Sequence, residues 1–170
     1  MLKHPDIISL IDSMAQALRK RDGIEESLII GIHSGGAWIA QYLHQILGNT
    51  QEIGMLDISF YRDDFTQIGL NPQVKSSDLP DSIEGRDIIL VDDVLHSGRT
   101  IRAAMNELFD YGRPKSISLA VLLDREGRQL PIQADVCGMN IHLAPHQQVK
   151  LSYVDNQFAL KTLSTNSTDL

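Results

Sequence analysis

The chain has 170 residues, is 42% hydrophobic and carries a formal net charge of −7, which fits one globular domain over residues 1–170 and excludes a second catalytic domain. No apolar run reaches the length of about 18 residues that spans a membrane, and the N-terminus lacks a signal-peptide pattern, so we expect a cytoplasmic protein. The negative charge is opposite in sign to the usual footprint of a nucleic-acid-binding protein.

The first half of the chain predicts two helices and two strands. The apolar stripe from Pro5 to Arg21 predicts an amphipathic helix. Residues 28–32 predict a buried strand, and residues 35–47 predict a second helix. Residues 53–61 predict another strand, and the long polar stretch after it, residues 62–85, has a length that is usually either functional or disordered.

The second half continues with alternating strands and helices. A strand over residues 87–92, a helix over 100–111 and a strand over 116–123 favour a parallel α/β sheet. Further short strands are expected near residues 134–137, 149–154 and 157–161, before a polar tail from about residue 164. The predicted fold class is α/β, with a central, mostly parallel sheet flanked by helices.

Two adjacent carboxylates give the clearest functional signal in the chain. Asp92 and Asp93 follow the apolar run Ile-Ile-Leu-Val of residues 88–91, which suits a strand that is buried on both faces. Open α/β sheets bind ligands at the carboxyl ends of such strands. Vicinal ribose hydroxyls donate hydrogen bonds well to carboxylates, so we expect this pair to hold a ribose.

The turn after the acidic pair has the features of a phosphate site. A helix is predicted to begin near Thr100, and the first amides of a helix lack internal partners and carry the positive end of its dipole. The chain has neither a Walker A string nor a dinucleotide fingerprint. For each residue alone, a strand end or a helix cap remains the alternative. The candidate phosphate-binding residues are Val94, Leu95, His96, Ser97, Gly98, Arg99 and Thr100.

This segment resembles the phosphoribosyl pyrophosphate (PRPP) signature of type I phosphoribosyltransferases. The surrounding chain is similar to the PyrR family of bifunctional uracil phosphoribosyltransferases and pyrimidine-operon regulators. The resemblance implies the type I phosphoribosyltransferase fold, in which a small hood accompanies the sheet. Three further segments carry it, namely Gly-Ile-His-Ser-Gly-Gly at 31–36, Asp-Ile-Ser-Phe-Tyr-Arg-Asp-Asp at 57–64 and Leu-Asp-Arg-Glu-Gly-Arg-Gln-Leu-Pro-Ile-Gln-Ala-Asp at 123–135.

The resemblance implies that two of these segments hold the leaving group. His33, Ser34, Gly35 and Gly36 correspond to the pyrophosphate-binding loop, although Gly35 stands where the family pattern Thr-Arg-Gly has arginine. We expect Mg²⁺ to arrive with PRPP rather than on dedicated protein ligands. Arg62 begins the loop that closes over PRPP, where it is expected to clamp the pyrophosphate.

The third segment matches the uracil-binding hood, with Asp124, Arg125 and Arg128 as candidate base-binding residues. The resemblance implies transfer of the 5-phosphoribosyl group from PRPP to uracil, giving UMP and pyrophosphate. It assigns the catalytic roles to Asp92, Asp93 and the arginine of the closing loop. It also implies a homo-oligomer of two or more chains.

Two alternatives to this function remain open. The base could be orotate or a purine, because the PRPP-binding machinery is common to the superfamily. The protein could instead be an RNA-binding attenuator of pyrimidine genes that takes UMP as its effector. The acidic composition disfavours RNA as a partner, although folding or oligomerisation can gather basic residues on one face.

Overall fold

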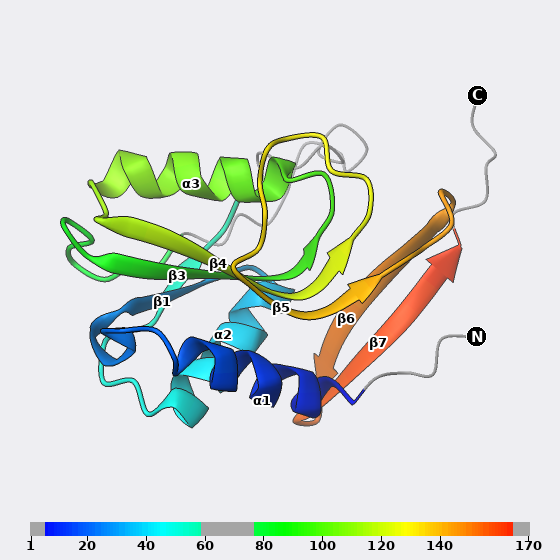
Figure 1. The fold of residues 1–170 in the computed structure, drawn as a ribbon, viewed down its shortest axis with the longest axis horizontal. Coiled ribbons are helices and arrows are strands. Elements are labelled where there is room, and N and C mark those ends of the chain that lie inside the picture. The colour runs from blue at the N-terminus through cyan, green and yellow to red at the C-terminus, as the bar shows by residue number, and fades with distance from the viewer. Residues whose placement is uncertain (1–5, 59–76, 165–170) are drawn as a thin grey trace.

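The computed structural model describes residues 6–58 and 77–164, and a five-stranded sheet in the order β2-β1-β3-β4-β5 lies at its centre (Figure 1). Every pair of neighbouring strands in this sheet is parallel. This order places β3 in the middle of the sheet, between β1 and β4. The strands are β1 (Leu28–Ile32), β2 (Gly54–Leu56), β3 (Asp87–Leu95), β4 (Ser116–Arg125) and β5 (Val136–Ile141).

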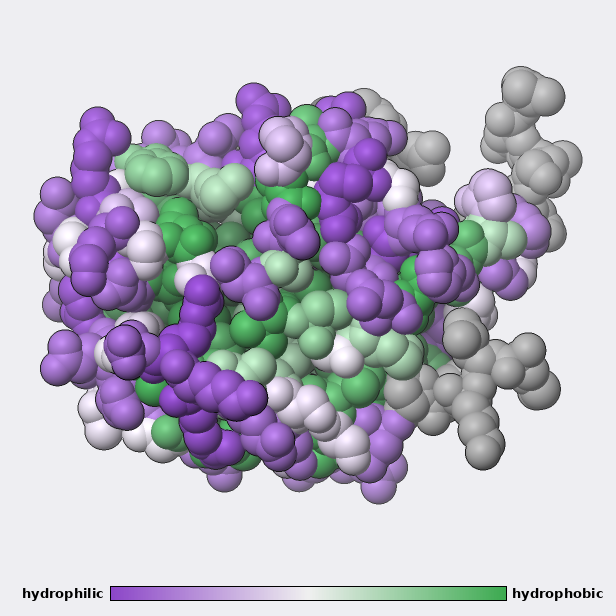
Figure 2. Space-filling view, in the orientation of Figure 1, coloured by the Kyte–Doolittle hydropathy of each residue, from purple (hydrophilic) through white to green (hydrophobic). Residues whose placement is uncertain are grey.

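Helices cover both faces of the sheet. The helices α1 (Ile7–Leu18) and α2 (Gly35–Leu47) lie on one face, and α3 (Arg99–Tyr111) lies on the other (Figure 1). Alternate residues of β1 serve the two layers, because Ile29 packs with α1 and α2 whereas Ile30 packs with α3. This two-sided burial explains why the strand is apolar throughout. Figure 2 shows polar side chains over much of the surface, with apolar surface between the two helical layers.

A hairpin of β6 (Gln147–Val154) and β7 (Gln157–Ser164) forms a separate two-stranded antiparallel sheet. Its turn residues Asp155 and Asn156 have positive φ angles of 51° and 60°, as a two-residue hairpin turn requires. The aromatic ring of Tyr153 lies 4.6 Å from that of Phe158 and 6.0 Å from that of Trp38 on α2. These contacts fix the hairpin against the helix that starts at the sheet edge.

The predicted fold class is confirmed, and the helix over residues 35–47 has its predicted bounds. The first helix is shorter than predicted and starts at Ile7, because the Asp6 side chain caps it by accepting from the amides of Ile8 and Ser9. The strand predicted over residues 53–61 is a strand only at Gly54–Leu56, since its partner β1 ends at Ile32; residues 59–61 lie outside the described part.

The strand predicted over residues 87–92 continues to Leu95, because β4 pairs with it as far as Leu95↔Asp124. Similarly, the strand predicted over 134–137 is Val136–Ile141, paired along its length with β4. The acidic pair therefore lies inside β3 rather than after it. Among the described residues, no helix combines the length and apolar character needed to cross a membrane.

Candidate active site

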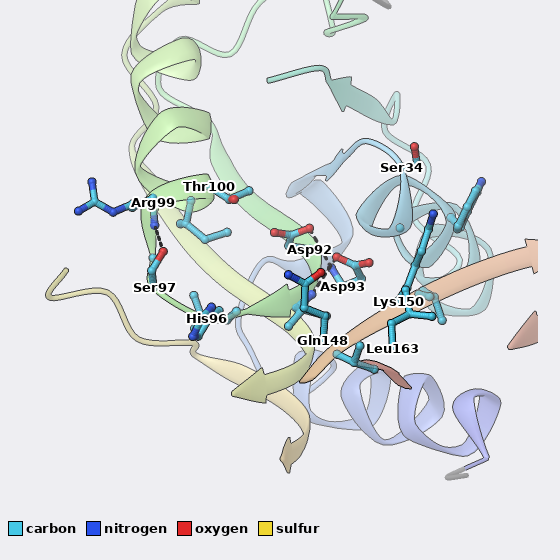
Figure 3. A pocket seen from close by; sticks show the side chains of 18 residues that line it. Ser34, Asp92, Asp93, His96, Ser97, Arg99, Thr100, Gln148, Lys150 and Leu163 are labelled. Carbon is cyan, nitrogen blue, oxygen red and sulfur yellow. Dashed lines mark hydrogen bonds between the residues drawn. The ribbon is translucent and has the colours of Figure 1, made fainter. Parts of the chain in front are cut away.

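Asp92 and Asp93 lie on the last part of β3, which pairs with β4 but no longer with β1. β1 pairs with β3 only as far as Gly31↔Val91, whereas β4 continues beyond it. Asp92 is 2% exposed and Asp93 is half-buried. The amide of Asp93 donates to Asp92 Oδ1 and the amide of Val94 donates to Asp93 Oδ1, each at 2.9 Å. These bonds hold both carboxylates at the sheet edge in a defined orientation (Figure 3).

The two glycines that open α2 occupy the space beside β3 where β1 has ended. A Cβ on Gly36 would lie 2.4 Å from the carbonyl oxygen of Val91, so backbone packing requires glycine there. A Cβ on Gly35 would lie 2.2 Å from Asp93 Oδ2 and 2.8 Å from Asp93 Cβ. The side-chain position of residue 35, which is arginine in the family pattern, is therefore filled here by the Asp93 carboxyl.

The loop before α3 is shaped as an anion site. Gly98 is the N-cap with a φ of 93°, a left-handed conformation that favours glycine. Ser97 Oγ accepts from the Arg99 amide at 3.2 Å, and the Arg102 amide makes the first helical bond, to the Gly98 carbonyl, at 3.0 Å. The first amides of α3, including that of Thr100, have no acceptor within the helix. This loop can therefore offer backbone donors to a phosphate.

A cavity of about 710 Å³ joins these segments (Figure 3). It brings together the predicted residues Ser34, Gly35, Asp92, Asp93 and 94–100. The predicted residues His33 and Gly36 do not line it. Gly36 lies behind its wall against β3, and the amide of His33 donates to the Leu56 carbonyl at 2.9 Å. Arg62 lies outside the described residues.

Part of the cavity wall was not predicted from the sequence. Trp38 comes from α2, and Gln148, Lys150 and Leu163 come from the hairpin. The alternation of polar and apolar residues over 147–154 is a signal for a strand, and Gln148 and Lys150 fall on its polar face. That pattern does not reveal which part of the fold the hairpin contacts, so these residues could not be assigned to a site.

The three predicted hood residues line a second cavity of about 440 Å³. Arg128 Nη2 donates to Asp124 Oδ1 at 2.6 Å, and Nη1 of the same guanidinium donates to the carbonyl of His96 in the loop before α3. Arg125 donates to the carbonyl of Ala144 at 3.4 Å. The guanidinium of Arg128 thus connects the hood segment to the loop that precedes α3.

The hood also changes the ionisation of His96. Burial, followed by the positive charges of Arg125 and Arg128, lowers the pKa of the imidazole from its ordinary value of 6.5. His96 is consequently uncharged at neutral pH. It can exchange hydrogen bonds with a ligand, but it does not add a positive charge to the cavity.

Among its described residues, the cavity offers few side chains that could bind a metal ion. The described ranges contain no group of three or more His, Cys, Asp or Glu side chains that could hold one. The cavity does present two neighbouring carboxylates, Asp92 and Asp93. Mg²⁺ commonly keeps several waters and binds one or two carboxylates together with substrate phosphates. The residues present therefore fit Mg²⁺ that arrives with a phosphorylated substrate.

Comparison with known proteins places this geometry in a family. A model of the phosphoribosyl transferase domain matches residues 1–155. The bifunctional protein PyrR of Pseudomonas putida (strain W619) is 55% identical over 151 residues, which are 87% of this chain and 88% of the relative. The bifunctional protein PyrR of Nitrosococcus oceani is 51% identical over 162 residues, 92% of each chain.

A solved structure supports the same fold. The purine phosphoribosyltransferase of Pyrococcus horikoshii Ot3 superposes with a TM-score of 0.62 at 24% identity, over 82% of this chain and 87% of that one. At this identity the likeness shows the fold alone, whereas the PyrR relatives show the family. The family and the enzyme class predicted from the sequence are thus confirmed, and the chain is a phosphoribosyltransferase that belongs to the bifunctional PyrR family.

Proposed function

We propose that this protein transfers the 5-phosphoribosyl group of PRPP to uracil, giving UMP and pyrophosphate. The observation that carries the proposal is the position of Asp92 and Asp93, which lie in one cavity with the Gly35 turn on one side and the start of α3 on the other. A phosphorylated ribose with a pyrophosphate leaving group has three parts that match these three places. The membership of the chain in the PyrR family supports uracil as the acceptor.

The residues of the cavity act mainly by position and charge. Amides and hydroxyls of residues 96–100 hold the 5-phosphate, and the two carboxylates hold the ribose hydroxyls. The bond between C1 of ribose and the pyrophosphate oxygen breaks with its electron pair leaving on pyrophosphate. N1 of uracil bonds to C1, and its proton is taken up by the released pyrophosphate. Positive charge develops on the ribose during this exchange, and the nearby Asp92 and Asp93 stabilise it.

The leaving group is held at the turn of Ser34 and Gly35. Mg²⁺, when bound with PRPP, supplies charge neutralisation for the pyrophosphate. We assign the clamp on the same group to Arg62, which lies outside the described residues, because its segment resembles the loop that closes over PRPP and excludes water. Gly36 packs against β3 behind the cavity wall and shapes the turn, and His33 precedes the turn with its amide bonded to the Leu56 carbonyl.

The hood segment holds the base beside the phosphate loop. Asp124 and Arg125 contact the pyrimidine, while Arg128 is a positioning residue, because its guanidinium is already bonded to Asp124 and to the carbonyl of His96. Base recognition therefore depends on the placement of residues 124–128 relative to His96.

Turnover of PRPP with uracil, orotate, guanine and hypoxanthine in parallel tests this function. The expected result is rapid formation of UMP and pyrophosphate with uracil and little product with the other bases. A nucleotide product from guanine or hypoxanthine at a higher rate would contradict uracil as the acceptor. No product from any base would contradict the assignment of the transferase reaction.

Regulation of pyrimidine genes is the second function, favoured because the relatives carry the name bifunctional protein PyrR. It requires binding of RNA by a chain with a net charge of −7, so the basic residues must gather locally or across a homo-oligomer in the cytoplasm. A gel shift of the protein's own pyrimidine leader RNA, with UMP present, should show a complex that weakens steeply with salt. Absence of a shift at low salt would contradict this function.

A further inference from the structure

The charges on the cavity wall do not balance those of a phosphorylated substrate. Asp92 and Asp93 add negative charge to a site that would receive a polyanion. Of the described residues that line the cavity, only Arg99 and Lys150 carry a fixed positive charge. Arg99 Nε donates to Gln129 Oε1 at 2.9 Å, and in Figure 3 its guanidinium extends away from the acidic pair. Among the described residues of the cavity wall, Lys150 is therefore the cation placed to face the ligand.

The hairpin places Lys150 beside a second lysine. Lys150 and Lys161 are direct partners in the register of β6 and β7, so their side chains leave the same face of the hairpin. Like charges in directly opposite positions destabilise an antiparallel pair. Lys150 is exposed and forms no ion pair within the described residues. An anion bound at this face would relieve the repulsion between the two ammonium groups.

The opposite face of the hairpin fixes Lys150 in place. Leu151, the next residue along β6, is 3% exposed and belongs to the core under α1 and α2. Tyr153 contacts Trp38, which lies in the first turn of α2, close to Ser34 and Gly35. The backbone that carries Lys150 is thus tied to the helix that begins at the pyrophosphate turn. Figure 3 shows the Lys150 side chain rising from β6 on the side of the cavity where Ser34 lies.

We propose that Lys150 binds the pyrophosphate of PRPP and supplies, from the hairpin, the positive charge that position 35 lacks. This inference rests on the proposed function, because it assumes that PRPP is the ligand of the cavity. Gly35 leaves no side-chain space because the Asp93 carboxyl fills it. A cation from a neighbouring element can neutralise the leaving group while Asp93 keeps its orientation.

The test compares three lysines that undergo the same chemical change. Lys150→Gln removes the proposed contact, Lys161→Gln removes its cross-strand neighbour, and Lys20→Gln is the control. Lys20 is exposed, and the adjacent Arg19 side chain bonds to the Ile46 carbonyl near the end of α2. Lys20 therefore lies at the sheet edge opposite the cavity. Lys150→Arg tests whether another cation restores the contact. Each variant is measured for its affinity for magnesium pyrophosphate by calorimetry and for kcat and KM with PRPP and uracil.

Lys150→Gln should weaken pyrophosphate binding and raise the KM for PRPP, each by roughly tenfold, with the KM for uracil unchanged. Lys161→Gln should have an effect of about two- to threefold, and added salt should shrink both effects. Lys150→Arg should recover most of the affinity, and Lys20→Gln should match the wild type.

Three outcomes separate the possible errors. If the wild type forms UMP and Lys150→Gln binds pyrophosphate as tightly as the wild type, the proposal for Lys150 is wrong. If Lys150→Gln weakens the binding of pyrophosphate and the binding of uracil equally, the residue is structural and the proposal is also wrong. If the wild type forms no UMP but binds pyrophosphate in a Lys150-dependent manner, the anion site is supported and the proposed uracil transfer fails.

Discussion

Two glycine-containing turns lie at the same edge of the sheet, and they are built in different ways. Both follow a parallel strand and open a helix. The turn at residues 96–100 contains its own determinants, namely the left-handed Gly98 cap and the Ser97 hydroxyl that accepts from the Arg99 amide. The turn at residues 34–36 has no charged side chain, and its glycines are pressed against β3.

The difference teaches which parts of a site are local. A phosphate can be held at residues 96–100 by backbone groups that the sequence places within one turn of helix. At residues 34–36 the chemistry is assembled from elements distant in the chain, because Asp93 comes from β3 and Lys150 from β6. The first turn should therefore depend mainly on its own residues and on the hood segment that bonds to it, whereas the second should respond to changes in three elements. The predictions below follow from this contrast.

The largest effect is expected at Asp92 and Asp93, which lie between the two turns. Replacing both carboxylates, Asp92→Asn with Asp93→Asn, should lower the rate of UMP formation by roughly a thousandfold or more, because the charge that stabilises the ribosyl centre is lost. The amide oxygens can still accept from the backbone amides that bond to the carboxylates, so circular dichroism and urea unfolding should be near those of the wild type. Turnover within about tenfold of the wild type would contradict the catalytic role of the pair.

The two adjacent glycines of the second turn should respond differently to alanine. Gly36→Ala places a Cβ against the backbone of β3, so the free energy of unfolding should fall by about 1–3 kcal/mol. Gly35→Ala instead displaces the Asp93 carboxyl, so it should cost less stability but lower the rate of UMP formation by roughly tenfold to a hundredfold. Urea unfolding and initial rates on both variants measure the contrast. Equal losses of stability with equal rates would refute the separate roles assigned to these glycines.

A smaller effect is expected at the hood. Arg128→Ala removes the bonds from the guanidinium to Asp124 and to the His96 carbonyl, so the KM for uracil should rise by roughly tenfold while that for PRPP changes little. The control is Arg102→Ala, an exposed arginine on α3. Steady-state kinetics with both substrates varied provides the comparison. A larger rise in the KM for PRPP than in that for uracil would argue against Arg128 as a hood-positioning residue.

The smallest effect concerns pH. Above pH 6.5, the ordinary pKa of histidine, His96 is neutral in both the folded and the unfolded chain. Below it the unfolded chain binds the proton first, because burial and the Arg125 and Arg128 charges lower the folded pKa. The free energy of unfolding should thus decrease as the pH falls below 6.5, until folded His96 is protonated as well.

His96→Gln should remove this part of the acid-side loss, and urea titrations on either side of that pH measure it. The change should be small, since the His96 side chain is only partly buried. An identical pH dependence in wild type and variant would show that His96 makes no contribution.

The turn that could be predicted from the sequence is the one with local determinants. Apolar runs, the helical period and the order of elements were sufficient for the parallel sheet and for the Asp92 to Thr100 segment. The extension of β3 to Leu95 could not be predicted, because it depends on pairing with β4, which is a tertiary contact.

The site residues that could not be predicted from the sequence also depend on tertiary contacts. Lys150 reaches the cavity because the hairpin packs on α2 through the rings of Tyr153 and Trp38. The sequence shows that Gly35 replaces an arginine of the family pattern, but only the structure shows that Asp93 occupies the space. The closing loop that starts at Arg62 lies outside the described residues, so its role remains a prediction.

A crystal structure of the protein with PRPP and Mg²⁺ would test the account most directly, because it locates all three parts of the substrate at once. We predict the 5-phosphate at the amides of residues 96–100, the ribose hydroxyls at Asp92 and Asp93, and the pyrophosphate between the Ser34 turn and Lys150. PRPP bound in the opposite direction, or with its ribose hydroxyls away from Asp92 and Asp93, would contradict the assignment of the site.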